Sequence, residues 1–263
     1  MGIVNVTPDS FSDGGAYRSV QDAIDAGMRM VEQGANILDL GGESTRPGAV
    51  PVLADEELRR VVPVVEGLVK RGARVSIDTY KAVVAREALA AGALMVNDVT
   101  AFRDPEMPGV CAAARCEVCL MHMQGDPQTM QLDPKYGDVV REVRSFLLDR
   151  GEVAQQSGIA REKIWVDPGI GFGKTDEHNV QLIRGLGVLV ETGYKVLIGV
   201  SRKGFLGRML AGGGEAVPVL ERLPGSLTIQ VVAQLAGVRA IRTHDVLETR
   251  RAILACERVS DFF

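Results

Sequence analysis

The sequence lacks the features typical of nucleic-acid-binding, membrane and secreted proteins. Its 30 Lys and Arg residues do not exceed its 34 Asp and Glu residues, and no stretch is rich in Lys or Arg, which argues against a nucleic-acid partner. The longest apolar runs, such as Val196–Val200, are far too short to cross a membrane, and the first residues lack the basic-then-apolar order of a signal peptide. We therefore expect a cytoplasmic protein without a membrane partner.

Cysteine is also scarce, with four residues in the whole chain. Cys111, Cys116 and Cys119 have the C-x4-C-x2-C spacing of a plant-type iron–sulfur site, and the other cysteine, Cys256, is near the far end of the sequence. The residues between the first three are mostly Ala and Val, as in a helix that leads into a buried strand. We expect all four cysteines to be buried thiols in a reducing compartment.

What the sequence does contain is a regular alternation of apolar runs and helix-period segments. The eight expected strands are Gly2–Val6, Ile37–Leu40, Val75–Ile77, Met95–Asp98, Val118–Met121, Ile164–Val166, Val196–Val200 and Ala240–Thr243. The expected helices include Ser19–Glu32, Asp55–Lys70, Tyr80–Ala91, Val139–Gln156, Thr228–Ala236 and Asp245–Glu257. Apolar strands separated by helices indicate a parallel sheet covered on both faces. Eight such units, with no linker between them, predict a (β/α)8 TIM barrel in which residues 1–263 form a single domain.

Polar residues follow every expected strand. In a (β/α)8 barrel the active site lies where the strands end and the next loops begin. The residues at these positions are Asn5, Asp39, Asp78, Asn97 with Asp98, His122, Asp167, Ser201 to Lys203, and Arg242 with His244. Helix N-caps would explain only some of them. We therefore expect a functional rim at this end of the barrel.

The segment Asp167–Thr175, DPGIGFGKT, resembles a phosphate-binding P-loop but does not match it. The P-loop pattern needs a first glycine where this chain has Pro168, so we do not expect ATP at this loop. A glycine-rich loop lets the backbone approach a flat ligand, and Asp167 would be its hydrogen-bonding group.

Two carboxylates, Asp78 and Asp167, are expected to point into the barrel mouth with Asn97 between them. A buried carboxylate needs a partner. A ligand with adjacent N–H donors, such as the amino-pyrimidinone edge of a pterin or guanine, would supply one. The alternative is that each carboxylate forms a buried ion pair with Lys203 or Arg202.

Cations gather after the last two strands, at Lys203, Arg242 and His244. The loops after strands seven and eight are the usual phosphate site of this fold, so we expect an anion subsite there. His178 is placed at a helix start and is expected to be a cap or surface residue. His122 follows strand five, and the sequence identifies no partner for it.

Eight motifs together resemble the dihydropteroate synthases of the folate pathway. They are NVTPDSFSDGG (Asn5–Gly15), ILDLGGESTRPGA (Ile37–Ala49), SIDT (Ser76–Thr79), VND (Val96–Asp98), MHMQG (Met121–Gly125), DPGIGFGKT (Asp167–Thr175), GVSRKGFLG (Gly199–Gly207) and RTHDV (Arg242–Val246). The resemblance covers nearly the whole chain. It implies a homodimeric (β/α)8 transferase that condenses 6-hydroxymethyl-7,8-dihydropterin diphosphate with 4-aminobenzoate, assisted by Mg²⁺, and that sulfonamides inhibit.

The resemblance also implies roles for individual residues. The pterin would be held by Asp78, Asn97, Asp167 and Lys203. Asn5 would ligate Mg²⁺, and the diphosphate would be bound by Asn5, Arg46, Arg242 and His244. The aminobenzoate pocket would involve Phe11, Thr45, Arg46, Pro47, Ser201 and Lys203. The catalytic residues would be Asp13, Lys203, Arg242 and His244, with Asp13 on a first loop that closes over the substrates together with the second.

The displacement itself needs two opposed electric fields. If the transition state is dissociative, positive charge develops on the pterin and negative charge on the diphosphate, so carboxylates are needed by the ring and cations by the leaving group. Two positions depart from the family pattern: Gly204 stands where serine is common, and Thr243 where valine is common. Neither removes a charge, so we expect altered drug or substrate affinity at most. Alternative functions are a pterin-dependent methyltransferase and a pterin-binding protein without catalysis.

Overall fold

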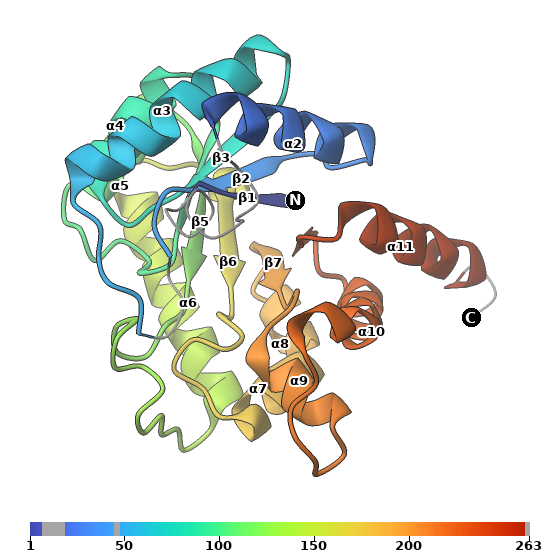
Figure 1. Cartoon of the computed structure of the whole chain (residues 1–263). Coiled ribbons are helices and arrows are strands. Elements are labelled where there is room, and N and C mark those ends of the chain that lie inside the picture. Colours follow the sequence, from blue (N-terminus) through green and yellow to red (C-terminus); the bar gives the residue numbers. More distant parts are fainter. Residues whose placement is uncertain (7–18, 45–47, 261–263) are drawn as a thin grey trace.

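Eight strands alternate with helices along the chain. The computed structural model describes residues 1–6, 19–44 and 48–260. In Figure 1 the helices lie outside the ring of strands. The strands are β1 (Gly2–Asn5), β2 (Leu38–Gly41), β3 (Val75–Asp78), β4 (Met95–Asp98), β5 (Glu117–Met121), β6 (Ile164–Asp167), β7 (Lys195–Gly199) and β8 (Ala240–Arg242). Each overlaps an expected strand, and each end lies within one residue of its expected position.

The strands pair in parallel in chain order, from β1 to β8, and the first returns to the last. The N–H of Ile3 donates to the carbonyl of Thr243 at 3.0 Å, and the N–H of Thr243 donates to the carbonyl of Met1 at 3.0 Å. A parallel bridge between Gly2 and Thr243 accompanies these bonds. The prediction of a (β/α)8 barrel is confirmed.

The helices extend the expected set. They are α2 (Val20–Glu32), α3 (Ala54–Lys70), α4 (Ala82–Ala90), α5 (Met107–Ala114), α6 (Val139–Gln156), α7 (Asp176–Arg184), α8 (Leu186–Val190), α9 (Gly204–Leu210), α10 (Leu223–Leu235) and α11 (Val246–Ser260), with 3-10 turns at Arg161–Lys163 and Val219–Glu221. The expected start of α10 at Thr228 was wrong, because Pro224 lies in the first turn, where proline is tolerated. His178 forms a capping box with Thr175 at the start of α7, which confirms its expected role.

Apolar side chains fill the barrel at the amino end of the strands. Met95, Cys119, Trp165 and Leu197 pack together there as one buried cluster. The indole N–H of Trp165 donates to a carboxylate oxygen of Glu117 at 2.5 Å, so its polar atom is satisfied. The barrel is therefore closed by packing at this end, and its polar groups gather at the other.

The cysteines agree with the expectation of buried thiols. Cys111, Cys116 and Cys119 are free thiols, and Cys256 is also buried. Burial raises the pKa of the Cys119 thiol well above its usual 9.0, so the group stays protonated at neutral pH. Within the part of the chain that the structure describes, no helix is long and apolar enough to cross a membrane.

Candidate functional site

The register of the sheet brings the predicted polar residues into one layer at the carboxyl ends of the strands. Asn5 pairs with Gly41, Gly41 with Asp78, and Asp78 with Asn97. Because all the strands are parallel, these positions share one rim of the barrel. On the other half of the ring Asp167 pairs with Met121, and Arg242 with Gly199. Asp78, Asn97 and Asp167 therefore lie at one rim, as expected, and Arg242 lies at the same rim although it was expected on the opposite side.

Arg242 lies among the carboxylates rather than apart from them. Its Nε donates to Oδ2 of Asp39 at 2.5 Å, and its Nη2 donates to Oδ2 of Asp78 at 2.7 Å. The amide of Asn97 donates to the same oxygen of Asp39 at 3.0 Å. Sequence reasoning treated Asp39 only as a strand-end residue, although a lone aspartate inside the apolar run ILDL was a usable signal.

The two carboxylates beside Arg242 each keep one oxygen without a hydrogen-bond partner within the described residues. These atoms are Oδ1 of Asp39 and Oδ1 of Asp78. Burial raises the pKa of Asp78 to about 7, Arg242 opposes this, and the charge of Asp39 adds to it. A buried acceptor without a donor is costly. A ligand that offers N–H groups here would therefore gain two prepared acceptors.

Asp167, at the end of β6, and Lys203, after β7, lie close enough for their charges to interact. The N–H of Gly169 donates to Oδ1 of Asp167 at 2.7 Å. Burial raises the pKa of Asp167, and Lys203 is the main opposing charge. The amine of Lys203 donates to the carbonyl of Ile170 and lies 4.6 Å from the centroid of the Phe172 ring. Phe172 was not predicted as a site residue, although it is the one aromatic residue within the glycine-rich segment DPGIGFGKT.

Lys203 provides a pH-dependence prediction. Burial lowers its pKa from 10.5 to about 8, and Arg242 adds to this while Asp167 opposes it. The charged form is present below that value and is lost as the pH rises through it. For a reaction at this mouth that needs the Lys203 ammonium, we expect kcat/KM to fall about tenfold per pH unit above this pKa. A pH–rate profile measures this. In the variant Lys203→Met the same limb should disappear; a limb that persists in that variant would assign it to another group.

Ser201 and His244 form a separate pair at the ends of β7 and β8. The Oγ of Ser201 lies 3.0 Å from Nδ1 of His244 and accepts the His244 backbone N–H at 3.2 Å. Next to it, Arg202 forms an ion pair with Asp245, with Nε 3.2 Å from Oδ2. The alternative that Arg202 pairs with Asp78 or Asp167 is therefore wrong, and Asp78 pairs with Arg242 instead.

Several predicted site residues lie outside the described residues. They are Phe11 and Asp13 of the first loop and Thr45, Arg46 and Pro47 of the second. Glu43 is the described anchor of the second loop: its carboxylate accepts from the hydroxyl of Tyr80 at 2.7 Å, from the N–H of Val52 at 3.2 Å, and from the amine of Lys81. Glu43 thus joins the chain before and after residues 45–47.

The surroundings of Asn5 fit a magnesium ion in one respect. A Cβ built on Gly41 would lie 3.7 Å from both Oδ1 of Asn5 and Oδ2 of Asp78, so glycine leaves the space between these oxygens open. The described residues contain no group of three His, Cys, Asp or Glu side chains that could hold a metal. Mg²⁺ commonly uses one or two protein oxygens together with water and substrate phosphates, and this donor set suits that mode.

Thr243, one of the two departures from the family pattern, belongs to a buried hydrogen-bond network. Its hydroxyl accepts from the N–H of Asp245 at 3.2 Å and lies 3.1 Å from the hydroxyl of Thr249. Gln230 donates to it at 3.4 Å. The threonine therefore packs between α10 and α11 and faces away from the mouth.

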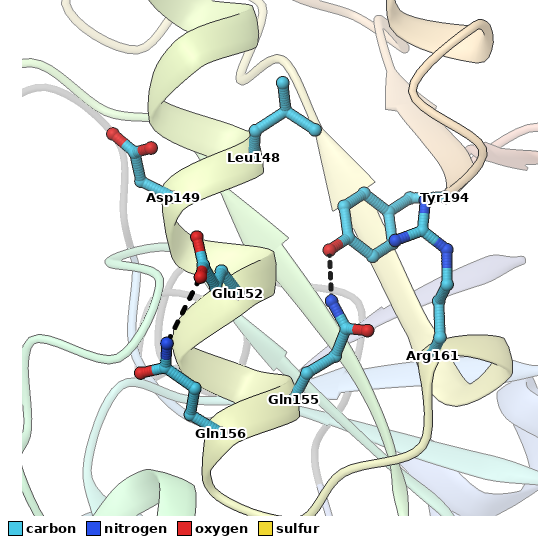
Figure 2. A pocket seen from close by; sticks show the side chains of 7 residues that line it. All are labelled: Leu148, Asp149, Glu152, Gln155, Gln156, Arg161 and Tyr194. Carbon is cyan, nitrogen blue, oxygen red and sulfur yellow. Dashed lines mark hydrogen bonds between the residues drawn. The ribbon is translucent and has the colours of Figure 1, made fainter.

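A surface hollow lies at the opposite end of the strands. Tyr194 precedes β7 and Arg161 precedes β6, and Figure 2 shows both beside α6. Gln155 donates to the Tyr194 hydroxyl at 2.7 Å, and the Arg161 guanidinium lies 4.3 Å from the centroid of the Tyr194 ring. These side chains satisfy one another, and the hollow has no part in the site at the mouth.

Comparison with known proteins identifies the kind of site. A family model described as pterin binding enzyme matches residues 1–244. The dihydropteroate synthase of Escherichia coli K12 is 45% identical over 258 residues, which is 98% of this chain and 90% of that protein. The dihydropteroate synthase of Mycobacterium leprae is 46% identical over 249 residues, covering 94% of this chain and 88% of that protein.

Solved structures agree with the sequence comparison. The Yersinia pestis dihydropteroate synthase in complex with a sulfonamide drug superposes with a TM-score of 0.93 at 43% identity, covering 99% of this chain and 94% of that one. The Xanthomonas albilineans dihydropteroate synthase with 4-aminobenzoic acid has a TM-score of 0.92 at 46% identity, covering 99% and 92%. The same enzyme has also been solved in complex with 7,8-dihydropteroate, with a TM-score of 0.88 at 42% identity and the same coverage.

Proposed function

Because the chain belongs to the dihydropteroate synthase family of pterin-binding enzymes, we propose that the barrel mouth condenses 6-hydroxymethyl-7,8-dihydropterin diphosphate with 4-aminobenzoate. The products are 7,8-dihydropteroate and diphosphate. The observation that carries this proposal is the pair of buried carboxylate oxygens beside Arg242, on Asp39 and Asp78, that have no donor within the described residues. The N–H edge of a pterin ring supplies such donors.

The pterin ring is bound by Asp78, Asn97, Asp167 and Lys203, and Asp39 acts with them through Arg242. The negative charges of these carboxylates favour a dissociative reaction. As the bond between the methylene carbon and the diphosphate oxygen breaks, positive charge spreads over the pterin, and the carboxylates stabilise it. The nitrogen of 4-aminobenzoate then bonds to the methylene carbon and loses a proton to the diphosphate or to water. Arg242, which bonds to both carboxylates, opposes the rise in the pKa of Asp78 that burial causes.

In this proposal the diphosphate is held by Asn5, Arg46, Arg242 and His244, and Arg242 also bonds to the carboxylates on the pterin side. Asn5 would supply an amide oxygen to Mg²⁺, and the ion would supply positive charge to the leaving diphosphate. The hydrogen bond between Ser201 and Nδ1 of His244 orients the imidazole at the end of β8. His244 is thus held in one orientation, which a charged leaving group requires.

Ser201→Ala provides a test of this orientation. Without the hydroxyl, the His244 ring loses its partner at Nδ1, and we expect kcat to fall about tenfold, the cost of roughly one lost hydrogen bond. Dihydropterin affinity, measured by calorimetry on the same sample, should stay within twofold because Asp78 and Asn97 are untouched. Ser201→Thr keeps the hydroxyl and serves as the matched control. Equal losses in kcat and in pterin affinity would contradict the proposed role.

The aminobenzoate pocket is proposed to combine described and undescribed residues. Ser201 and Lys203 lie at the described edge of the pocket, and Phe172 packs against Lys203. Phe11, Thr45, Arg46 and Pro47 complete it, and Asp13 enters during chemistry. We propose that sulfonamides bind in the same pocket; the Yersinia pestis relative has been solved in complex with a sulfonamide drug. Gly204, which starts α9 beside this pocket, would shift sulfonamide and aminobenzoate affinity.

Three further properties belong to the proposal. Residues 1–263 work as a single domain, the protein is a homodimer, and it acts in the cytoplasm. The eight-stranded ring supports the first, because one closed sheet joins the first described strand to the last. The family resemblance supports the other two, and gel filtration with light scattering tests the dimer.

Diphosphate release from the pterin substrate is the decisive experiment. We expect turnover only when 4-aminobenzoate and Mg²⁺ are both present, with dihydropteroate formed in equal amount. Pterin binding without turnover would favour a non-catalytic binding protein. Turnover of methyltetrahydrofolate with a corrinoid acceptor would favour the methyltransferase alternative, which has no use for the cations around β7 and β8.

A further inference from the structure

Lys174 is a buried lysine that the proposed chemistry does not use. Its side chain is 2% exposed, and lysine is seldom buried unless it is paired. Its amine lies 2.9 Å from Nδ1 of His122, and it donates to the carbonyl of Phe172 at 2.9 Å and to that of His122 at 3.5 Å. None of these partners, which are all within the described residues, is a carboxylate.

Burial disfavours the charged forms of both Lys174 and His122. Burial lowers the pKa of Lys174 well below its usual 10.5, the charge of Lys203 adds to this, and Asp167 opposes it. Burial lowers the pKa of His122 to about 3, and Lys174 and Arg103 add to it. The His122 ring is covered by Phe146, edge-on at 4.9 Å. The Nδ1 atom of a neutral imidazole can accept a hydrogen bond from the Lys174 amine, so this contact needs no ion pair.

The glycine-rich loop that ends in Lys174 lies directly on the backbone after β5. A Cβ built on Gly169 would be 1.9 Å from the carbonyl oxygen of His122, and one on Gly173 would be 2.5 Å from that of Gln124. Both glycines have positive φ, 66° and 62°, which side chains disfavour. The hydrogen bond from the buried Lys174 amine to the carbonyl of Phe172 helps to hold the loop in this shape.

The same loop contacts Lys203 on its other surface. The amine of Lys203 donates to the carbonyl of Ile170 and lies over the Phe172 ring. A Cβ built on Gly171 would be 3.3 Å from Cδ of Lys203. The position of the Lys203 ammonium therefore depends on where residues 170–172 are held, and Lys174 holds the carbonyl of Phe172.

We propose that Lys174 is a positioning residue for Lys203: its amine ties the glycine-rich loop to His122 and so fixes the Ile170 carbonyl and the Phe172 ring against which Lys203 is set. This inference rests on the proposed role of Lys203 in the reaction. The groups that face Lys203 are Asp167 from β6, Arg242 from β8 and Lys174 from the loop. Without the Lys174 amine, the Ile170 carbonyl, which stabilises the Lys203 ammonium, is held less firmly.

Lys174→Met removes the amine and keeps most of the side-chain volume. A displacement of Lys203 by a fraction of an ångström to one ångström should lower kcat/KM for aminobenzoate by about 10- to 100-fold. The alkaline limb of the pH–rate profile should also move to lower pH, because the Lys203 ammonium loses its fixed acceptor. A limb that moves to higher pH would show that the substitution relieves charge repulsion on Lys203 rather than loosening its acceptor, and would overturn the proposal.

Lys163→Met is the matched control. Lys163 also donates its amine to a backbone carbonyl, that of Arg115, but it lies just before β6 at the far end of the barrel. The same substitution there should leave kcat/KM and the pH profile as in the wild type. If Lys174→Met has the same kcat/KM and pH profile as Lys163→Met while the wild type turns over, the proposed role of Lys174 is refuted. If the wild type itself does not turn over, the proposed function fails instead.

His122→Phe keeps the inference testable if Lys174→Met does not fold. The phenyl ring can pack against Phe146 as the imidazole does, and only the nitrogen partner of Lys174 is removed. We expect the alkaline limb to move in the same direction, with a loss of about 3- to 10-fold in kcat/KM, since one of two principal contacts of Lys174 remains. A wild-type rate and pH profile in this folded variant would overturn the proposal.

Discussion

Asp78→Asn is expected to weaken dihydropterin binding by about 100-fold or more, because a donor replaces an acceptor where the ligand presents N–H groups. Asp78 offers one oxygen to Arg242 at 2.7 Å, and its other oxygen has no donor within the described residues. An amide can keep the bond to Arg242 with its remaining oxygen. Its NH₂ group must then face the ligand edge, so the loss falls on binding rather than on folding. Isothermal titration calorimetry with a dihydropterin measures it.

Asp25→Asn is the matched control for this substitution. Asp25 also pairs with an arginine, Arg71, at 2.7 Å, but on the exposed outer surface of the barrel. We expect pterin affinity to be unchanged in that variant, and both variants to melt within a few degrees of the wild type. Unchanged affinity in Asp78→Asn would remove Asp78 from the pterin site. A collapse of the melting temperature would show instead that the charge is needed for the fold.

The fold was predictable from the sequence because each strand repeats the same signal. The buried runs Ile164–Val166 and Val196–Val200 are continuous and apolar, as strands covered on both faces must be. Helices with weak local signals were not delimited. The end of α5 was expected as a helix that leads into a buried strand, but its start was not, since α5 contains Pro108 and Gly109 and begins without a side-chain cap. α8, which is five residues long, was not expected. Tertiary packing rather than propensity forms such short helices.

The site was predictable in outline because parallel strands end at one rim. Which side chains bond to one another was not predictable. Arg242 and Asp39 are 203 residues apart in the chain, and nothing local to either residue indicates the pairing. Lys174 and His122 are 52 residues apart, and a lysine is normally expected at the surface rather than in the interior. The predictions for residues of the first and second loops lie outside the described residues and stay predictions.

Arg242→Met should destabilise the folded protein by about 3–5 kcal/mol, the usual cost of removing one partner from a buried ion pair. The guanidinium is 20% exposed, and the carboxylates that it joins are 0% exposed for Asp39 and 10% for Asp78. Without the cation, two neighbouring carboxylates remain with only Asn97 as a described donor between them. Urea unfolding at pH 8 measures the loss. Arg71→Met, which breaks the surface pair with Asp25, should cost about 1 kcal/mol or less.

The loss in Arg242→Met should depend on pH in a defined direction. Arg242 holds down a pKa of Asp78 that burial raises above its usual 3.8, so its removal raises that pKa further. A carboxyl whose pKa is higher in the folded state binds more protons folded than unfolded, and stability then falls as the pH rises between the two values. The variant should therefore be closest to the wild type at pH 5 and furthest from it at pH 8. An equal deficit at both values would contradict this account.

Combining Arg242→Met with Asp78→Asn separates charge from packing. If the deficit comes from carboxylates left without a cation, the double variant removes one of the two charges and should be more stable at pH 8 than Arg242→Met alone. Its stability should also vary less between pH 5 and pH 8, because Asp78 no longer titrates. If the deficit comes from a cavity where the guanidinium was, the second substitution cannot restore stability. The sign of the coupling energy between positions 78 and 242 therefore decides whether Arg242 acts on the mouth as a counter-charge.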